Sequence, residues 1–324
     1  MDEFEVIRRY FQRDNKFTND LVSVDSGDDC AVLKLPPGEE FCVSTDTLIE
    51  GVHFPMQASG TVAAARAMGA NLSDLAAMGA TPHSYTVALT IPEVNDSWLS
   101  QFSSTLAAVS QDNQMPLVGG NLAKGPLSIT VTIMGRVSAG EALLRSGAHV
   151  DDDIYVSGCL GDAAGGLKMV LENIEDTAGF RSPLLNRYQS PTARISLGQS
   201  LTGLASACID VSDGFLADLS HILKSSSVGA CIELEKLPVS SSLTNLLGHD
   251  AALAAAASGG DDYELCFTAP KSLRKKIANL NDDLVLTRVG HVTAGADLIV
   301  HDAEGIAMTD YATDAGLRGY THFK

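Results

Sequence analysis

Five short motifs in this chain combine aspartate with glycine, serine or threonine, and these residue types suit chemistry on phosphate groups. The motifs are Gly27-Asp28-Asp29, Ser44-Thr45-Asp46-Thr47, Asn71-Leu72-Ser73-Asp74, Asp210-Val211-Ser212-Asp213-Gly214 and Gly259-Gly260-Asp261-Asp262. Mg²⁺ prefers oxygen ligands and keeps waters and substrate phosphates in its coordination shell. Glycine beside the carboxylates lets the backbone approach a phosphate closely. Together the motifs indicate a polyphosphate that is held through metal ions.

Each motif alone also has an ordinary structural explanation. Gly27-Asp28-Asp29 is typical of a β-turn, and Ser212-Asp213-Gly214 is typical of a turn that leads into a helix. Asp74 is harder to explain in this way, because it follows Asn71 by one turn in an otherwise apolar helix, where an unpaired carboxylate is costly. Asp46 follows an apolar run, so we expect it at the carboxyl end of a strand, where ligands bind in α/β proteins.

The elements that must position these motifs alternate between strand and helix patterns. Helices are predicted at residues 4–11, 61–78 and 96–110, and from residue 162 onward. Strands are predicted at residues 30–35, 41–44, 84–91, 127–137, 154–157, 230–234 and 264–268, with a strand–turn–helix unit at 207–223. This alternation predicts α/β architecture in both halves, divided within residues 138–152. The direction of the strands does not follow from the pattern.

Composition limits the classes of partner. A chain of 324 residues with 45% hydrophobic residues is long and apolar enough for two packed domains. Its formal net charge of −18 makes nucleic acid and anionic membranes poor partners. An anion such as ATP would be repelled unless cations intervene. Ordinary surface charge explains most of the acidic residues.

Several features predict a cytoplasmic protein. The six cysteines form no C-x-x-C pair, and several lie in apolar runs, which is typical of free buried thiols in a reducing compartment. The first residues are acidic where a signal peptide would be basic. The Ala-rich stretch 61–80 contains Arg66, Asn71 and Asp74, so we expect no membrane span there.

Familiar nucleotide and metal signatures are missing from the sequence. It has no G-x-x-x-x-G-K-[ST] loop, and Gly158 and Gly161 do not have the spacing of G-x-G-x-x-G. Ser212-Asp213-Gly214-Phe215 is not D-F-G, and no H-R-D, H-E-x-x-H or EF-hand loop occurs. An enzyme with this sequence that uses ATP belongs to another lineage.

The order of the motifs resembles the bacterial thiamine-monophosphate kinases, a family within the aminoimidazole-ribonucleotide-synthetase-like superfamily. The matching stretches are GDDCAVL, STDTLIEGVHF, NLSDLAAMGA, LVGGN, LLRSGA, SGCLGDAAGGL, DVSDGFLADL, SGGDDYELCFT and GYTHF. The resemblance implies an α/β fold of the α+β type with two domains. Residues 1–140 would bind ATP and Mg²⁺ and form a homodimer, and residues 150–324 would complete the active site. The implied reaction converts ATP and thiamine monophosphate to ADP and thiamine diphosphate.

The resemblance also implies roles for single residues. The implied Mg²⁺ ligands are Asp29, Ser44, Thr45, Asp46, Asp74, Asn121, Asp210 and Asp213. The implied ATP contacts are Gly120, Asn121, Arg145 and Ser212, and the implied substrate contacts are His53, Asp261 and Tyr320. Without the resemblance, Arg145 would be interpreted as a solvated arginine and His53 as a surface histidine or a core histidine with satisfied hydrogen bonds.

Two residues depart from the family pattern. The family usually has aspartate at the position of Asn121, so one negative charge is missing from a metal site. It usually has glutamate at the position of Asp261, which carries the same charge on a shorter side chain. No covalent nucleophile or general base is expected, because the oxygen of a substrate phosphate is already an anion near neutral pH.

Two alternatives stay open at the level of sequence. The chain could be another ATPase of the superfamily that makes aminoimidazole ribonucleotide or selenophosphate. A selenophosphate synthetase would carry cysteine or selenocysteine in an N-terminal glycine-rich loop, and residues 1–26 contain no cysteine. The second alternative is a regulator that binds Mg²⁺ and nucleotide without catalysis.

Overall fold

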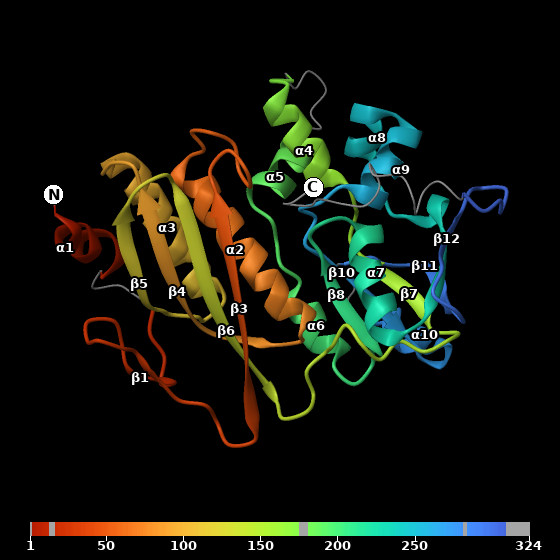
Figure 1. Cartoon of the computed structure of the whole chain (residues 1–324), viewed down its shortest axis with the longest axis horizontal. Helices are drawn as coiled ribbons and strands as arrows, with labels where there is room; N and C mark the ends of the chain where they lie inside the picture. Colours follow the sequence, from red (N-terminus) through yellow and green to blue (C-terminus); the bar gives the residue numbers. More distant parts are fainter. Residues whose placement is uncertain (1, 13–16, 175–180, 281–283, 309–324) are drawn as a thin grey trace. The chain divides into compact units, whose positions relative to one another are not determined.

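The computed structural model describes residues 2–12, 17–174, 181–280 and 284–308. The chain divides into two compact units (Figure 1). The N-terminal unit comprises Met1–Leu75 and Ala80–Gly140, and the C-terminal unit comprises Ala76–Gly79 and Glu141–Lys324. The predicted roles of residues 1–140 and 150–324 stay predictions.

The N-terminal unit contains a sheet with the strand order β3-β6-β4-β5. Its elements are α1 (Glu3–Val6), η1 (Ile7–Phe11), β1 (Val22–Val24), β2 (Val32–Leu33), β3 (Glu39–Ile49), α2 (Gly60–Ala77), β4 (Thr81–Ile91), α3 (Asp96–Asp112), β5 (Leu117–Lys124) and β6 (Ser128–Ser138). Strand β6 is antiparallel to β3 and β4, whereas β4 and β5 are parallel. The sheet is therefore mixed.

Among the residues that the structure describes, helices cover one face of this sheet and leave the other uncovered. Ile129, Val131 and Ile133 alternate along β6 and are fully buried, and Figure 1 shows α2 and α3 on one face of the sheet. Small side chains on α2, among them Ala63 and Ala67, are also fully buried and let the helix lie close to the strands. The intervening residues of β6 define an outer face, which is half exposed.

Periodic segments were predicted well and polar strands were not. The helices predicted at 61–78 and 96–110 are confirmed as α2 and α3, and the Asn95 side chain caps α3 by accepting a hydrogen bond from the Trp98 N–H at 3.0 Å. The prediction that Asp46 lies at the end of a strand is wrong, because β3 continues to Ile49. Strand β5, which contains Gly120, was not predicted.

The C-terminal unit contains a sheet with the strand order β12-β9-β11-β7-β10-β8. Its strands are β7 (Asp153–Ser157), β8 (Ala207–Val211), β9 (Gly229–Glu233), β10 (Glu264–Ala269), β11 (Leu286–Thr293) and β12 (Leu298–His301). Its helices are α4 (Asp162–Leu171), α5 (Arg181–Gln189), α6 (Ile195–Leu201), α7 (Phe215–Ser226), η2 (Leu234–Lys236), α8 (Ser241–Leu247), α9 (His249–Ser258), η3 (Lys271–Leu273) and α10 (Arg274–Ile277). All its strand pairs are antiparallel except β9 with β12.

The core of the C-terminal unit lies between α7 and its sheet. Phe215, Leu219 and Ile222 on α7 belong to one buried cluster with Ile154 of β7 and Ile209 of β8. A smaller cluster joins α4, α5, α8 and α9. Among the helices that the structure describes, none combines the length and apolar character needed to cross a membrane. Both units thus mix helix and sheet, as predicted.

Candidate active site

In the N-terminal unit, β3 and α2 bring three of the predicted metal ligands to one face of the sheet. Ser44 and Asp46 are half-buried on the helix-covered face, because they pair with the fully buried Ile133 and Val131 of β6. The Ser44 Oγ donates to the Asp74 Oδ2 of α2 at 2.5 Å. A hydroxyl and carboxylates therefore gather between the strand and the helix.

Thr45 lies on the opposite face of the same strand. Its Oγ1 donates to the Oγ1 of Thr132 at 3.0 Å, and the hydroxyls of Thr47 and Thr130 are 2.8 Å apart on the same outer face. Because neighbouring residues of a strand point to opposite faces, the Thr45 side chain cannot ligate an ion together with Ser44. Only its backbone carbonyl remains as a possible ligand there.

Gly120 and Asn121 lie on β5, three strands away from Asp46. Asp46 pairs with Val131, Val131 with Val87, and Val87 with Gly120, so Asp46 and Gly120 are roughly 14 Å apart at about 4.8 Å per strand. Asn121 is exposed on the outer face, opposite to Asp46. Within one chain, Asp46 and Asn121 therefore do not share an ion. Gly120 is required structurally, since an added Cβ would lie 2.0 Å from the Val87 carbonyl oxygen.

The remaining candidates of the N-terminal unit lie in loops. Asp29 is exposed, and its N–H donates to the Asp28 carboxylate at 2.9 Å. His53 accepts a 3.0 Å hydrogen bond from the Ile49 N–H through Nδ1. Its carbonyl accepts bonds from Arg66, whose side chain is almost fully buried. The loop that carries His53 is therefore fixed by the body of α2.

In the C-terminal unit, the turn between β8 and α7 is held by a residue that sequence reasoning missed. Oδ2 of Asp218 accepts the N–H groups of Ser212, Asp213 and Gly214 at 2.9, 3.1 and 3.1 Å. Burial and, to a lesser extent, the nearby Asp213 carboxylate raise the pKa of Asp218 to about 7, although the three N–H bonds oppose the rise. The sequence signal for this role was the position of the Asp218 carboxylate, one turn into an otherwise apolar helix.

Asp210 and Arg145 differ strongly in burial. Asp210 is 4% exposed on β8, where it pairs with Leu265 of β10. Arg145 is exposed, and its carbonyl accepts a hydrogen bond from the Ser226 Oγ at 3.4 Å. An exposed guanidinium can bind a phosphate through two parallel (bidentate) hydrogen bonds.

The Gly259-Gly260-Asp261-Asp262 motif contains a predicted substrate contact and a buried acid beside it. Asp261 is half-buried and accepts a 3.0 Å hydrogen bond from the Tyr263 hydroxyl. Asp262 is fully buried and accepts the N–H groups of Gly161 and Ala163, at the start of α4, at 2.6 and 3.3 Å. Burial raises the pKa of Asp262 to about 8, against the lowering effect of these donors and of a nearby arginine.

Glu264 anchors a buried ion network next to this motif. It receives hydrogen bonds from Ser157 at 2.6 Å, from Arg187 at 2.7 Å and from Arg194 at 2.7 Å. A Cβ added to Gly158 would lie 2.3 Å from the Glu264 carboxylate, so the backbone at Gly158 packs directly against this carboxylate. Sequence reasoning missed this network, although an acid in an apolar strand must be paired when it is buried.

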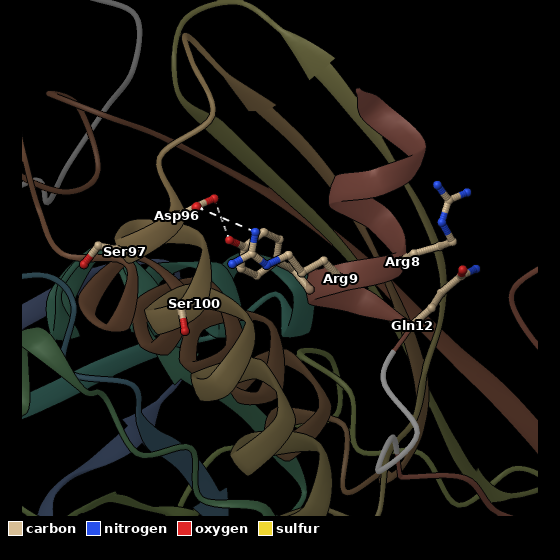
Figure 2. Close-up of a pocket in the computed structure, with 7 residues that line it drawn as sticks. Arg8, Arg9, Gln12, Asp96, Ser97 and Ser100 are labelled. Carbon is tan, nitrogen blue, oxygen red and sulfur yellow. Dashed lines mark hydrogen bonds and ion pairs between the residues drawn. The ribbon is translucent and has the colours of Figure 1, made fainter. Parts of the chain in front are cut away.

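The N-terminal unit also contains a cavity of about 830 Å³. Figure 2 shows it between η1 and the start of α3, with Arg9 and Asp96 among the residues that line it. The Asp96 carboxylate accepts a hydrogen bond from Tyr10 at 2.8 Å and lies 3.7 Å from Arg9. No predicted site residue lines this cavity, so we do not assign the chemistry to it.

The donor set fits Mg²⁺ that is completed by substrate phosphates. Within residues 2–12, 17–174, 181–280 and 284–308, no three acidic, histidine or cysteine side chains form a ready-made metal site. Mg²⁺ is usually bound through one or two carboxylates plus phosphates and waters, which matches the Ser44 and Asp74 pair. One turn before Asp74, the buried Oδ1 of Asn71 finds no hydrogen-bond partner among the described residues, and a metal-bound water would supply one. Tyr320 lies outside the described residues.

Known proteins match the whole chain. The family described as AIR synthase related protein matches with its N-terminal domain at residues 27–137 and its C-terminal domain at residues 150–303. The chain is 42% identical to the thiamine-monophosphate kinase of Salmonella typhimurium, over 99% of this chain and 98% of that protein. It is similar to the crystal structure of thiamine-monophosphate kinase from Stenotrophomonas maltophilia K279a, with 40% identity, a TM-score of 0.86 and coverage of 95% and 98% of the two chains. It is also similar to AaThiL complexed with AMPPCP and TMP, with 29% identity, a TM-score of 0.75 and coverage of 94% of each chain.

Proposed function

Because the chain belongs to the thiamine-monophosphate kinase family of AIR synthase related proteins, we propose that it transfers the γ-phosphoryl group of ATP to thiamine monophosphate. The products are ADP and thiamine diphosphate, so this is the last step of thiamine diphosphate biosynthesis. The observation that carries the proposal is 42% identity over 99% of the chain to a thiamine-monophosphate kinase. The complex of AaThiL with AMPPCP, an analogue of ATP, and with TMP supports the binding of both ligands by this chain.

Carboxylates of both units are proposed to hold several Mg²⁺ ions. In the N-terminal unit the ligands are Asp29, Ser44, Thr45, Asp46, Asp74 and Asn121, and in the C-terminal unit they are Asp210 and Asp213. When bound, Mg²⁺ neutralises the charge of the transferring phosphoryl group and of two anionic ligands beside an acidic protein. The side chains of Ser44, Asp46 and Asp74 are held by β3 and α2, so their oxygens are in place before any ligand arrives.

Other residues are proposed to bind the two organic ligands. Gly120, Asn121, Arg145 and Ser212 bind ATP, and His53, Asp261 and Tyr320 bind thiamine monophosphate. At Gly120 the backbone lies against β4 without a side chain, and an exposed arginine such as Arg145 suits a phosphate. The Asp261 carboxylate complements the cationic thiazolium ring of the acceptor.

We propose a homodimer that forms through the outer face of the N-terminal sheet. This face carries the threonine pairs of β3 and β6 and the exposed apolar side chains Phe41, Val43 and Ile49, which are 41%, 62% and 40% exposed. An exposed apolar sheet face marks an interaction site, and a second copy would present the same face. Sedimentation of Val43→Glu tests this, because a charge on this face should yield monomers.

The transfer is proposed to be direct. The acceptor oxygen is already anionic, and the chain positions carboxylates and donors without a nucleophile that must first be activated.

The six cysteines are all free thiols, which supports a cytoplasmic protein. The net charge of −18 supports a protein without nucleic acid or membrane partners.

One assay tests the function. The protein is incubated with ATP, Mg²⁺ and thiamine monophosphate, and thiamine diphosphate is measured. Free thiamine should be a poor acceptor, because its hydroxyl would need a base that this site does not supply. The absence of thiamine diphosphate would contradict the proposal, as would equal rates with free thiamine. A labelled phosphoenzyme trapped from γ-labelled ATP would contradict direct transfer.

A further inference from the structure

The segment that joins α9 to β10 carries two non-glycine residues in the left-handed backbone region. Asp261 has a φ of +70° and Tyr263 has a φ of +49°. Residues other than glycine seldom adopt this region, and they persist in it where the surrounding structure fixes them, often at functional sites. Both residues lie in the C-terminal unit.

Backbone hydrogen bonds fix this segment to the end of β8. The Asp261 N–H donates to the Ser212 carbonyl at 2.8 Å, and the Tyr263 N–H donates to the Val211 carbonyl at 2.7 Å. A Cβ added to Gly260 would lie 2.6 Å from the Ser212 carbonyl oxygen, so the two segments are in close contact. The left-handed residues therefore cannot relax without separating from β8 and the turn that follows it.

Buried polar groups fix the same segment from inside the unit. The Asp262 carboxylate binds the N–H groups at the start of α4, and the Arg187 Nη2 donates to the Asp262 carbonyl at 2.6 Å. Alternate residues thus serve different purposes. Asp262 holds the backbone, while the side chains of Asp261 and Tyr263 bind each other at 3.0 Å.

We propose that Tyr263 is a positioning residue that orients the Asp261 carboxylate toward the cationic ring of the acceptor, an inference that rests on the proposed function. Tyr263 is only 8% exposed, so its ring is fixed by packing and its hydroxyl offers a donor at a constant position. Aspartate has only two side-chain torsions, so one hydrogen bond to Oδ1 fixes most of its freedom. A carboxylate that is oriented before the acceptor binds loses less conformational freedom on binding.

The test compares Tyr263→Phe with the wild-type protein. This change removes one hydroxyl and keeps the ring, so we expect the KM for thiamine monophosphate to rise about tenfold, the effect of losing a hydrogen bond to a charged group. The kcat and the KM for ATP should stay within about twofold, since neither depends on Asp261 in this scheme. Tyr155→Phe is the matched control, because Tyr155 is 6% exposed and its hydroxyl donates to the Asp153 carboxylate at 3.5 Å.

A double-mutant cycle separates positioning from a merely structural role. In an Asp261→Ala background, Tyr263→Phe should have no further effect on the KM for thiamine monophosphate, because the residue through which it acts is gone. The inference is overturned if Tyr263→Phe leaves this KM unchanged, or raises it equally in both backgrounds, or raises the KM for ATP as much. It is also overturned if Tyr155→Phe has the same effect. Failure of the proposed function would be distinct, since the wild-type protein would then form no thiamine diphosphate.

Discussion

Asp46 and Asp74 of the N-terminal unit are held in a different way from Asp213 and Asp261 of the C-terminal unit. In the N-terminal unit, Asp46 and Asp74 project from a regular strand and a regular helix, and the Ser44–Asp74 hydrogen bond joins these elements. In the C-terminal unit, Asp213 and Asp261 lie on irregular turns. Each of these turns is held by a fully or almost fully buried carboxylate, Asp218 in one case and Asp262 in the other.

This difference predicts where function and stability can be separated. The half-buried ligands of the N-terminal unit are not needed to form β3 or α2, whose ladder and apolar face hold them in any case. The buried acids of the C-terminal unit form part of the packed structure, so their removal leaves unsatisfied donors or unpaired charges. Changes in the first set should alter turnover, and changes in the second should alter the free energy of unfolding.

The largest effect is expected from Asp74→Asn. The loss of one charge from a Mg²⁺ site should reduce kcat by about three orders of magnitude, which corresponds to several kcal/mol of transition-state stabilisation. The midpoint of thermal unfolding should move by no more than about 2 °C, because the amide can still accept the Ser44 hydroxyl. Steady-state rates at saturating ATP and Mg²⁺ and thermal scans measure both quantities.

The control for Asp74→Asn is Asp112→Asn, which neutralises an exposed acid at the end of α3 in the same unit. It should change neither the rate nor the unfolding midpoint. Near-normal turnover of Asp74→Asn would remove Asp74 from the ligand set. An unfolding midpoint lowered as strongly as the rate would remove the contrast between the two units.

The next effect concerns the buried network of the C-terminal unit. Glu264→Gln leaves the guanidinium groups of Arg187 and Arg194, which are 18% and 19% exposed, without their shared counter-charge. We expect the free energy of unfolding to fall by about 3 kcal/mol. Urea unfolding measures it, with Glu172→Gln as the control. Glu172 pairs with Lys168 on the surface, and its loss should cost less than about 1 kcal/mol. Equal losses for the two variants would contradict the role of the network.

The pH dependence of stability should distinguish two buried aspartates of the same unit. Burial raises the pKa of Asp262 to about 8, so the folded state binds its proton more tightly than the unfolded state does. Its contribution to stability is therefore complete below pH 4 and is lost as the pH rises toward 8. Asp153 has the opposite sign. Burial alone would raise its pKa, but hydrogen bonds from Arg274 and Arg288 lower it, so its contribution is lost as the pH falls below about 4.

Thermal unfolding between pH 3 and pH 8.5 tests these signs. Asp262→Asn, which cannot ionise, should flatten the decline in stability between pH 4 and pH 8. Asp153→Asn should cost most stability near neutral pH and least near pH 3. A profile of Asp262→Asn parallel to that of the wild type would show that the Asp262 carboxyl is already ionised across this range.

The sequence predicted elements whose apolar pattern runs through their whole length. The predicted segments 61–78 and 127–137 correspond to α2 (Gly60–Ala77) and β6 (Ser128–Ser138). In β3 the apolar run ends at Val43, yet the strand continues through Ser44, Thr45 and Asp46 because its partner β6 extends the hydrogen-bonded ladder. That information lies in another segment of the chain, so local pattern could not supply it.

For the candidate site, the sequence suggests residue types but does not show which residues support them. The motifs predict Asp74, Asp213 and Asp261 as site residues because small polar residues surround them, and these roles stay predictions. The partners of Glu264, by contrast, are Arg187 and Arg194, which are 77 and 70 residues away in the chain. Nothing local to a strand shows which distant arginine will fold against it. Such buried networks are better sought by first finding acidic residues in apolar strands and then finding the basic residues that could pair with them.

The smallest expected effect concerns Asn121, where the candidate set lacks a charge. We expect this protein to need more Mg²⁺ than its Asn121→Asp variant, because an amide oxygen ligates without charge and carboxylate charge strengthens Mg²⁺ binding. The competing view is that Asp46 already supplies this charge, in which case a further carboxylate would only add repulsion. The sheet argues against that view within one chain, since Asp46 and Asn121 lie on opposite faces and Gly120 is three strands from Asp46.

Activity is titrated against Mg²⁺ at fixed ATP for the wild type and for Asn121→Asp, and the half-saturating Mg²⁺ concentration of the variant should be several-fold lower. Because Asn121 is exposed, the change should leave the unfolding midpoint in place, as expected for the N-terminal unit. Asn113→Asp is the matched control, since it adds the same charge to the same unit at the end of α3, away from the candidate ligands. A shift to higher Mg²⁺ would contradict the prediction and show that Asn121 is not a weakened ligand. An unmoved curve would show that Asn121 is not a ligand, and the metal set of the N-terminal unit would then consist of the residues on β3, on α2 and at Asp29.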